Sequence, residues 1–281
     1  MKIKLGASLL SWITPNWTAE AGHYAIKKTA QTGFDLIEIL LPTNMEFDSE
    51  TVKKQLKENK LDVACSLNLP KEAHIPYYPK AALELICKAL DKTAAVESTF
   101  LGGVLHSGIG VFNGNPVTIY EKEIVINVLG EAALYAQKLG ITIGIEPINR
   151  YESYVCNTAA NVLEIIDKTT TNLAVHLDTF HMNIEENNFY DPIIASGKKL
   201  KHLHITESNR GMPGEGTVNW DALFKGLKDI NFEGNLVLEN FSSSIAGMQQ
   251  AVSLWQTSPH NAEELAIGSL NFMRKKIEDL D

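Results

Sequence analysis

The chain has 281 residues, 44% of them hydrophobic and 21% charged, so it can bury a sizeable core. Its 34 acidic residues outnumber 25 basic ones, and the net charge of -9 argues against the basic face that binding to a nucleic-acid backbone requires. Three cysteines are too few for a disulfide framework and no apolar run approaches the ~18 residues of a membrane span, so we expect a reduced, cytoplasmic protein with no nucleic-acid or membrane partner.

The N-terminal segment MKIKLGASLLSW looks like a signal peptide only superficially, because Gly6 and Ser8 interrupt its apolar run and no small-residue cleavage site follows. We interpret it as the first of eight β-strands. The strands are expected at Ile3–Leu10, Phe34–Leu40, Leu61–Asn68, Thr99–His106, Ile141–Pro147, Leu173–Thr179, Leu200–Thr206 and Asn235–Phe241.

Amphipathic segments with a helical pattern lie between these strands. They include Ala81–Val96, Ile119–Leu139 and Asn219–Ile230. Pro79 stands near a helix start, where its missing N–H costs nothing. Gly33, Gly140 and Gly234 come just before the second, fifth and eighth strands, so we expect them at helix C-caps or tight turns.

Most of the strands are near-continuous apolar runs, as expected for parallel strands that are covered on both faces. Eight strand–helix units without a change of composition predict an α/β protein with a single (β/α)8 TIM-barrel domain over residues 1–281. A doubly wound open sheet is the alternative. It would usually carry a glycine-rich first turn, and GASLLSW does not fit GxGxxG.

Polar residues stand at the carboxyl ends of the last four strands, where a barrel places its chemistry. These residues are Glu146, Asp178, His204 and Glu239. Each has a simple structural explanation, such as a surface ion pair or, for Asp178, a cap on the following turn. Four at matching strand ends are harder to explain in this way, and buried together they would repel one another unless a cation neutralised them.

Three further residues near this end of the barrel are interpreted separately. His176, in an apolar strand, is interpreted as a satisfied core residue. His202 shares the face of His204 by strand alternation, so it is either an outer partner of the site or a ligand in place of His204. Glu38 points to a barrel end and is expected to support the site from behind.

Three carboxylates and one imidazole form a hard, oxygen-rich ligand set, which favours Mn²⁺, Mg²⁺ or Co²⁺ over an ion that prefers thiolates. Zn²⁺ is also compatible with such a set. We therefore expect one divalent metal ion, with Mn²⁺ favoured.

Four motifs in order resemble the D-tagatose 3-epimerase and D-psicose (D-allulose) 3-epimerase group of the xylose-isomerase-like TIM-barrel superfamily. They are EPINRYE, LDTFHMNIEE, HLHITESNRGMPGEG and LVLENF, between about Gly140 and Phe241. The resemblance implies a metal-dependent isomerase of sugars, and relatives of this kind suggest a homodimer or homotetramer.

The resemblance also implies roles for individual residues. Glu146 and Glu239 match the two glutamates that bind the metal and move protons, and Asp178 and His204 match the other two metal ligands. Three more residues match groups that hold the ketose near its carbonyl end: Glu152, His181 and Arg210.

The chemistry suits these residue types in its own right. Removal of a proton beside a ketone requires a base, and the resulting cis-enediolate needs positive charge near its oxygens, which a metal ion supplies. Two carboxylates on opposite faces of the sugar can take the C3 proton from one side and return one from the other, which inverts the centre.

Two regions depart from the pattern of relatives that act on free ketohexoses. Ser8 and Leu9 stand in the first strand roughly where those relatives carry aromatic residues, and His106 stands at the end of the fourth strand where a different residue is expected. Both loops are expected to contact the distal part of the substrate. A ketohexose, a ketopentose, a phosphorylated ketose and a 3-keto glycoside are therefore all open as substrates.

Two other segments are given structural roles. Arg150 in EPINRYE is interpreted as an ion-pair partner of a nearby carboxylate. The glycine-rich Pro213–Trp220 segment lacks the phosphate-loop pattern and is interpreted as a turn into a helix that begins near Asn219. Trp12 and Trp17 are expected either to wall the sugar site or to pack the barrel.

Three alternative functions are weighed against the epimerase. A lyase of the inosose dehydratase type would use the same metal to eliminate water. An endonuclease of the multi-zinc type needs more His and Asp ligands and a DNA-binding surface, which eight histidines and the acidic balance disfavour. A sugar-binding barrel without activity would not need two proton-transferring glutamates.

Overall fold

A computed structural model of the protein describes residues 2–169 and 173–279. Within these residues, each strand pairs in parallel with the next and β8 pairs with β1, which closes a barrel. The strands are β1 (Lys2–Ser8), β2 (Leu36–Leu40), β3 (Asp62–Ser66), β4 (Phe100–Gly102), β5 (Thr142–Ile145), β6 (Leu173–Asp178), β7 (Leu200–Ile205) and β8 (Glu233–Leu238). The expected α/β barrel is confirmed, and every expected strand is present, although each is shorter than expected and β1 and β8 begin one and two residues earlier.

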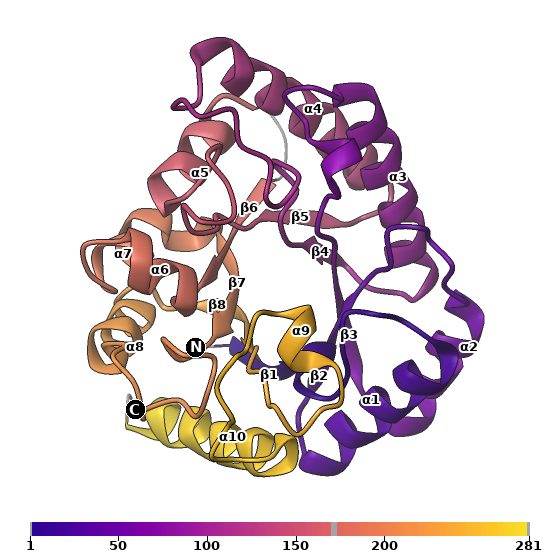
Figure 1. Ribbon diagram of the computed structural model, residues 1–281, viewed down its shortest axis with the longest axis vertical. Coiled ribbons are helices and arrows are strands. Elements are labelled where there is room, and N and C mark those ends of the chain that lie inside the picture. Colours follow the sequence, from indigo (N-terminus) through magenta and orange to yellow (C-terminus); the bar gives the residue numbers. More distant parts are fainter. Residues whose placement is uncertain (1, 170–172, 280–281) are drawn as a thin grey trace.

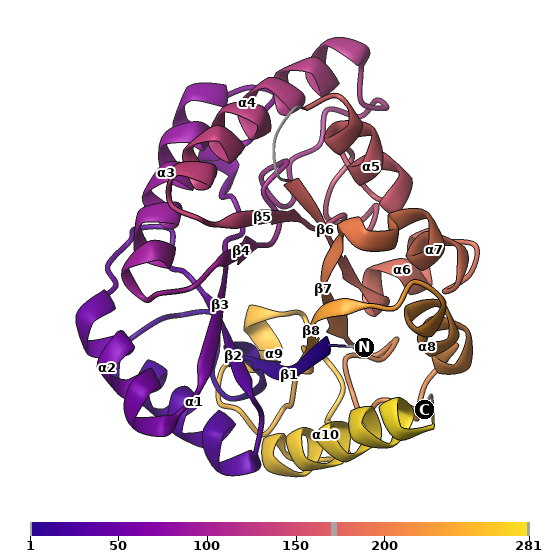
Figure 2. The ribbon, with the colours of Figure 1, turned by 180° about the vertical axis from the view of Figure 1, so that it is seen from behind.

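Helices surround the barrel (Figure 1). They are α1 (Ala19–Thr32), α2 (Ser49–Asn59), α3 (Pro79–Ala95), α4 (Ile119–Lys138), α5 (Ala159–Asp167), α6 (Thr179–Glu185), α7 (Asp191–Ser196), α8 (Trp220–Asp229), α9 (Met248–Ala251) and α10 (Ala262–Glu278). Three short 3-10 turns accompany them: η1 (Leu9–Ser11), η2 (Lys71–Ala73) and η3 (Gly197–Lys199). The short helix α9 lies in front of β1 and β2 in Figure 1 and behind them in Figure 2, over one end of the barrel.

Local sequence explains where the main helices begin. The side chain of Thr118 accepts a hydrogen bond from the N–H of Glu121, and the Glu121 carboxylate accepts one from the N–H of Thr118, a reciprocal cap that satisfies free donors at the start of α4. Asn219 caps α8 in the same general way, so the Pro213–Trp220 segment is a turn into this helix, as expected. Pro79 occupies the first turn of α3, also as expected.

Two of the three glycine expectations are confirmed and one is wrong. Gly33 ends α1 with φ 95°, and Gly140 has φ 70° ahead of β5. Gly234 instead lies inside β8, and a Cβ there would stand 2.2 Å from the carbonyl oxygen of Lys201. Its role is to let β8 approach β7 closely, while the turn after α8 uses Asn231 at φ 50°.

The barrel interior changes from apolar to polar along the strands. Side chains alternate between the two faces of each strand, and Leu36, Ala64, Phe100 and Val237 form a small apolar cluster inside. Two positions further along the same strands stand Glu38, Ser66, Gly102 and Glu239. The large apolar core lies between the sheet and the helices. The polar residues therefore gather inside the carboxyl end of the barrel.

No helix within residues 2–169 and 173–279 is long and apolar enough to cross a membrane.

Candidate active site

A cavity of about 420 Å³ opens at the carboxyl ends of the strands. The segment after β8 closes part of its rim through Ala251, Val252 and Ser253, at the end of α9 and just beyond it. All predicted site residues except Asp178 line this cavity, namely Glu146, Glu152, His181, His204, Arg210 and Glu239. Asp178 is fully buried and reaches the same place through its contacts with His204 and Arg210.

The carboxylates converge on the Nδ1 atom of His204. This atom lies 3.6 Å from Oε1 of Glu146, 3.8 Å from Oδ2 of Asp178 and 3.6 Å from Oε2 of Glu239. It is buried and has no hydrogen-bond partner. Ligand atoms of Glu146, Asp178 and His204 all lie within 4.8 Å of one another. Anionic oxygens gathered around an unpaired imidazole nitrogen are what a divalent cation requires, so these residues could hold one.

Burial raises the pKa of both glutamates. Loss of water raises the pKa of Glu146 to about 7, and the negative charges of Glu239 and Asp178 add to this effect while His204 opposes it. Burial likewise raises the pKa of Glu239, although Arg210 works in the other direction. Glu146 is thereby able to take up or release a proton near neutral pH.

Asp178 has the opposite electrostatics. Burial disfavours its charge, but Arg210 and His204 hold the pKa of its carboxyl below the usual range. Its Oδ2 accepts a hydrogen bond of 2.8 Å from Nη1 of Arg210, and its Oδ1 accepts one of 2.8 Å from the N–H of Phe180 at the start of α6. Asp178 is therefore both a helix cap and a charged member of the site.

Arg210 links two of the carboxylates. Its Nη1 donates to Asp178 and to Oε2 of Glu239. The guanidinium lies 4.1 Å from the ring centre of Phe180 and 4.8 Å from that of Phe241, so the two rings hold it from the sides. Arg210 has φ 61°, a conformation that costs a non-glycine residue roughly 1–3 kcal/mol, and these contacts offset that cost.

His181 and Glu152 are both positioned by Asn149, a residue that sequence reasoning missed. Nδ1 of His181 accepts a hydrogen bond of 3.2 Å from the N–H of Asn149, so the ring proton of the neutral imidazole lies on Nε2. Burial lowers the pKa of His181 to about 3, which keeps the ring neutral. The amide Nδ2 of Asn149 donates to Oε1 of Glu152 at 2.8 Å.

Arg150 is directed away from the site, as expected. Its Nε and Nη2 donate to the two oxygens of Glu185 at 2.9 and 3.0 Å, and its backbone N–H donates to the same carboxylate at 2.7 Å. The charged loop after β5 thus separates into a structural ion pair and a residue, Glu152, that faces the cavity.

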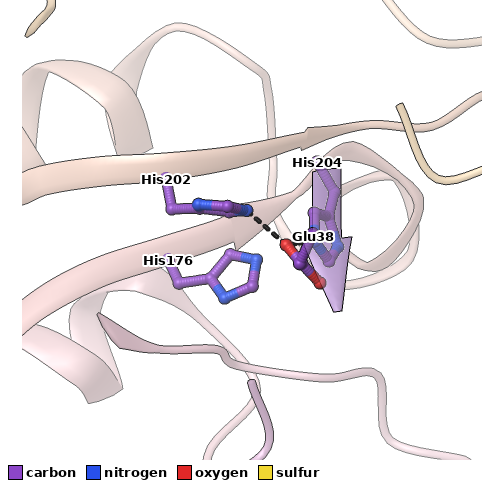
Figure 3. A group of neighbouring side chains, drawn as sticks. All are labelled: Glu38, His176, His202 and His204. Carbon is purple, nitrogen blue, oxygen red and sulfur yellow. Dashed lines mark hydrogen bonds and ion pairs between the residues drawn. The ribbon is translucent and has the colours of Figure 1, made fainter. Parts of the chain in front are cut away.

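A second polar cluster adjoins the first on the inner side of His204. Figure 3 shows Glu38 with the imidazole rings of His176, His202 and His204 around it. Oε2 of Glu38 lies 2.9 Å from Nε2 of His204 and 2.5 Å from Nε2 of His202, and Oε1 accepts a hydrogen bond of 2.8 Å from Ser66. Glu38 thus lines the cavity and contacts His204 at the nitrogen opposite Nδ1, as expected of a residue that supports the site. His202 contacts Glu38, which favours the first of its two interpretations, an outer partner of the site.

The interpretation of His176 as a satisfied core residue is wrong. Its Nδ1 accepts a hydrogen bond of 3.1 Å from the N–H of Gly103, but its Nε2 is buried without a hydrogen-bond partner. The ring has room because Gly102 and Gly144 lack side chains: a Cβ on Gly102 would lie 2.7 Å from Nδ1 of His176, and one on Gly144 would lie 3.2 Å from its Cβ. Glycines at interior positions of two neighbouring strands were the signal that a bulky polar ring lies between them.

The two departures from the family pattern reach the cavity only in part. Ser8 lines it, whereas Leu9 is buried in the core and Leu10 faces the cavity instead. His106 does not line it; its Nε2 lies 3.1 Å from the carbonyl oxygen of Glu146, behind the strand end. The expectation that His106 contacts the distal part of the substrate is therefore not supported by its position.

The tryptophans also lie outside this cavity. Trp12 is buried and its Nε1 donates to Thr29 at 2.9 Å. Trp17 packs against Phe47, with ring centres 4.9 Å apart, and against Gly22. Packing is thus the better of the two explanations considered for them.

Comparison with known proteins agrees with this geometry. A family described as "Xylose isomerase-like TIM barrel" matches residues 26–276. A ketose 3-epimerase from Arthrobacter globiformis is 35% identical over 282 residues, covering 98% of this chain and 97% of the relative. A D-psicose 3-epimerase from Agrobacterium fabrum is 34% identical over 250 residues, covering 85% and 86%. The crystal structure of a D-allulose 3-epimerase from Methylomonas sp. in complex with D-allulose superposes with a TM-score of 0.92 at 32% identity, covering 98% and 97%.

Proposed function

This chain belongs to the xylose isomerase-like TIM barrel family, and from that membership we propose that it is a divalent-metal-dependent ketose 3-epimerase with Glu146 and Glu239 as acid and base. The names of its relatives support the reaction class, since they include a ketose 3-epimerase and a D-psicose 3-epimerase that match most of its length. The remaining support comes from the residues at the barrel mouth.

One observation carries the proposal: two buried glutamates face one cavity from β5 and β8, and the pKa of each is raised by burial. Each places an oxygen 3.6 Å from Nδ1 of His204, so they approach the same central point from separate strands. A binding protein would need charged ligands but not two carboxyl groups tuned to exchange protons.

Glu146, Asp178, His204 and Glu239 are the residues that would hold the cation. The fit rests on the unpaired Nδ1 of His204 and on the carboxylate oxygens that face it. A divalent cation bound there would supply positive charge to the substrate oxygens that become negative when the proton is removed.

The two glutamates then divide the proton transfer. Glu146 takes the proton from C3 of the ketose, which leaves a cis-enediolate, and Glu239 delivers a proton to the opposite face of C3. The reverse reaction exchanges their roles. Each glutamate therefore acts as a base in one direction and as an acid in the other.

Three neighbours are assigned to substrate orientation. Nε2 of His181 carries a proton and can donate it to a sugar oxygen, since Nδ1 is already an acceptor. Glu152 can accept a hydrogen bond from a hydroxyl, and Arg210 can donate to an oxygen while it holds Asp178 and Glu239. Such contacts restrict the substrate to the reactive geometry.

The lining of the cavity favours an uncharged ketose over a phosphorylated one. Arg210 is the one lysine or arginine among the described residues that line it, and its guanidinium already serves two carboxylates. The remaining lining includes Leu10, Val104 and Ile109, which offer a phosphate neither charge nor hydrogen bonds. A phosphate group entering this cavity would meet the carboxylates of Glu146, Glu152 and Glu239 and find no free cationic side chain to offset its charge.

The experiment is an NMR screen of free and phosphorylated ketopentoses and ketohexoses in D₂O with Mn²⁺ added. Accumulation of the C3 epimer, with deuterium at C3, supports the proposal. A dehydrated product would instead establish a lyase of the inosose dehydratase type, and turnover restricted to phosphorylated ketoses would contradict the substrate assignment.

A further inference from the structure

The cluster of Glu38, His176, His202 and His204 has the composition of a second metal site. Its potential ligand atoms lie within 4.8 Å of one another, and all four residues are buried (Figure 3). None of these residues except His204 belongs to the proposed catalytic set. The direction of each hydrogen bond decides whether the cluster binds a metal or forms a hydrogen-bond network that orients His204.

The hydrogen bonds place the ring protons of His176 and His202 on Nε2. Nδ1 of His176 accepts from the N–H of Gly103 at 3.1 Å, and Nδ1 of His202 lies 3.4 Å from the amide Nδ2 of Asn235. A neutral imidazole that accepts at Nδ1 carries its proton on Nε2. A protonated nitrogen has no lone pair for a metal. The hydrogen bonds at Nδ1 of His176 and His202 therefore oppose metal binding at their Nε2 atoms.

Glu38 is the acceptor that faces Nε2 of His202 and Nε2 of His204. It is 2% exposed, and its Oε2 lies 2.5 Å from Nε2 of His202 and 2.9 Å from Nε2 of His204. Its Oε1 accepts from the hydroxyl of Ser66 at 2.8 Å. An ionised carboxylate can only accept hydrogen bonds, so the His204 nitrogen that faces it must be the donor.

We propose that Glu38 is a positioning residue that fixes the tautomer of His204. By keeping the proton on Nε2, Glu38 leaves the lone pair on Nδ1, the atom that faces Glu146, Asp178 and Glu239 at 3.6 to 3.8 Å. Carboxylates that accept from the far nitrogen of a metal-binding histidine orient the ring and raise its basicity. The consequence for cation binding rests on the proposed function, whereas the tautomer itself does not.

The tautomer is measured first on the unmodified protein. Long-range ¹H–¹⁵N spectra of ¹⁵N-histidine-labelled protein loaded with diamagnetic Mg²⁺ should show His204 protonated at Nε2, with the signal identified by its loss in His204→Gln. His176 and His202 should show the same tautomer. Protonation of His204 at Nδ1 would overturn the proposal, and this measurement requires no altered variant of Glu38 to fold.

The second measurement compares Glu38→Gln with Ser66→Ala by calorimetric titration of the chelator-treated protein with Mn²⁺. Glutamine keeps the shape of the side chain but presents an N–H₂ group as well as an oxygen, so it no longer dictates one tautomer of His204. Mn²⁺ affinity should fall by about 10–100-fold, the usual effect of losing such a partner. Ser66→Ala removes a hydrogen bond to the other oxygen of Glu38 and should bind Mn²⁺ as the unmodified protein does.

The same titrations separate the alternatives. Equal loss of affinity in Glu38→Gln and Ser66→Ala would reduce Glu38 to a packing role and contradict the proposal. Two bound Mn²⁺ ions per chain, with one lost in Glu38→Gln, would make the cluster a second metal site and also contradict it. If the unmodified protein bound no cation, the proposed function would fail. The NMR measurement would then be made on the cation-free protein at a pH above the pKa of His204, which Glu38 and Glu239 raise against the effect of burial, so that the neutral ring still shows its tautomer.

Discussion

Two buried glutamates at the carboxyl end of the barrel differ in the number of hydrogen bonds that their carboxylates accept. Glu207, just after β7, accepts four hydrogen bonds within its own loop. The donors are the backbone N–H groups of Ser208, Gly214 and Val218 and the indole Nε1 of Trp220. Glu146, just after β5, receives no hydrogen bond to its carboxylate from the described residues, and His204 Nδ1 lies beyond hydrogen-bond distance at 3.6 Å.

The consequence is visible in the two pKa values. Burial acts against the charge of both groups, but the hydrogen bonds to Glu207 lower the pKa of its carboxyl, whereas burial of Glu146 without donors raises its pKa to about 7. A fully bonded carboxylate stabilises a loop. One left without donors has its acceptor capacity free for a ligand, so the protein forgoes stability at the site that we assign to chemistry.

The largest expected effect comes from removing the unbonded charge. Glu146→Gln should lower C3 exchange by about 10²–10⁴-fold, because the base is lost, and Glu239→Gln should do the same. Glu146→Gln should not lower the midpoint of urea unfolding in chelator-treated protein, since it removes a buried charge that like charges repel, whereas Glu239→Gln should lower it because Arg210 loses a charged partner. Deuterium incorporation and urea titration measure the two quantities. Normal turnover in both variants with Mn²⁺ bound would refute the two-glutamate mechanism.

The second largest effect is expected on stability, from substitution of Glu207, the glutamate whose carboxylate accepts four hydrogen bonds. Glu207→Gln places an N–H₂ group against two of the four donors, and we expect a loss of about 2–6 kcal/mol of unfolding free energy, at 1–3 kcal/mol for each donor left without a partner. Glu215→Gln is the matched control in the same loop, because Glu215 is exposed and pairs with His260. Its effect should stay within about 0.5 kcal/mol. Equal losses in both variants would show that Glu207 does not organise the loop.

The third test uses the opposite signs of the two pKa shifts. Glu207 has a lowered pKa when folded, so its stabilisation is present above its unfolded pKa of about 4.3 and is lost as pH falls through the folded value. Glu146 has a raised pKa, so ionisation disfavours folding and its contribution worsens from about pH 4.3 up to about 7.

Thermal unfolding of chelator-treated protein at a series of pH values measures how the contributions of Glu146 and Glu207 to stability depend on pH. The gain of Glu146→Gln over the unmodified protein should grow from about pH 4.3 to about 7 and then level off, while the deficit of Glu207→Gln should shrink below about pH 4.3. Curves that move together for the two variants would mean that the hydrogen-bond difference does not control their ionisation.

The sequence could predict the barrel and the residues Glu146, Asp178, His204 and Glu239 because both follow from patterns between neighbouring residues of the chain. Eight apolar runs and their helices are readable along the chain, and Glu146, Asp178, His204 and Glu239 stand at matching strand ends. Register then places their atoms around one point, as in the pairing of Asp178 with His204 and of His204 with Val237.

The inner cluster was harder to predict because it depends on which side chains meet across the barrel. The contact of Glu38 with His204 joins β2 to β7, and no local pattern specifies it. Gly234 was misplaced for a related reason: a glycine before a strand usually ends a helix, and only the approach of Lys201 shows why this one lies within β8. Asn149 was passed over because its role is to orient other side chains.

The smallest effect concerns Glu185, a third carboxylate, which accepts fewer hydrogen bonds than Glu207 and more than Glu146. It accepts two hydrogen bonds from the exposed guanidinium of Arg150 and one from the backbone N–H of the same residue. Arg150→Ala removes the two guanidinium hydrogen bonds and retains the backbone one, so we expect a loss of stability in urea unfolding that is smaller than the loss in Glu207→Gln and is diminished further at high salt. C3 exchange should be unchanged, because Arg150 does not line the cavity. A fall in exchange that matched the loss in Glu152→Gln would mean that the loop after β5 acts as one unit and that ion pairing at its outer side positions the sugar-facing glutamate.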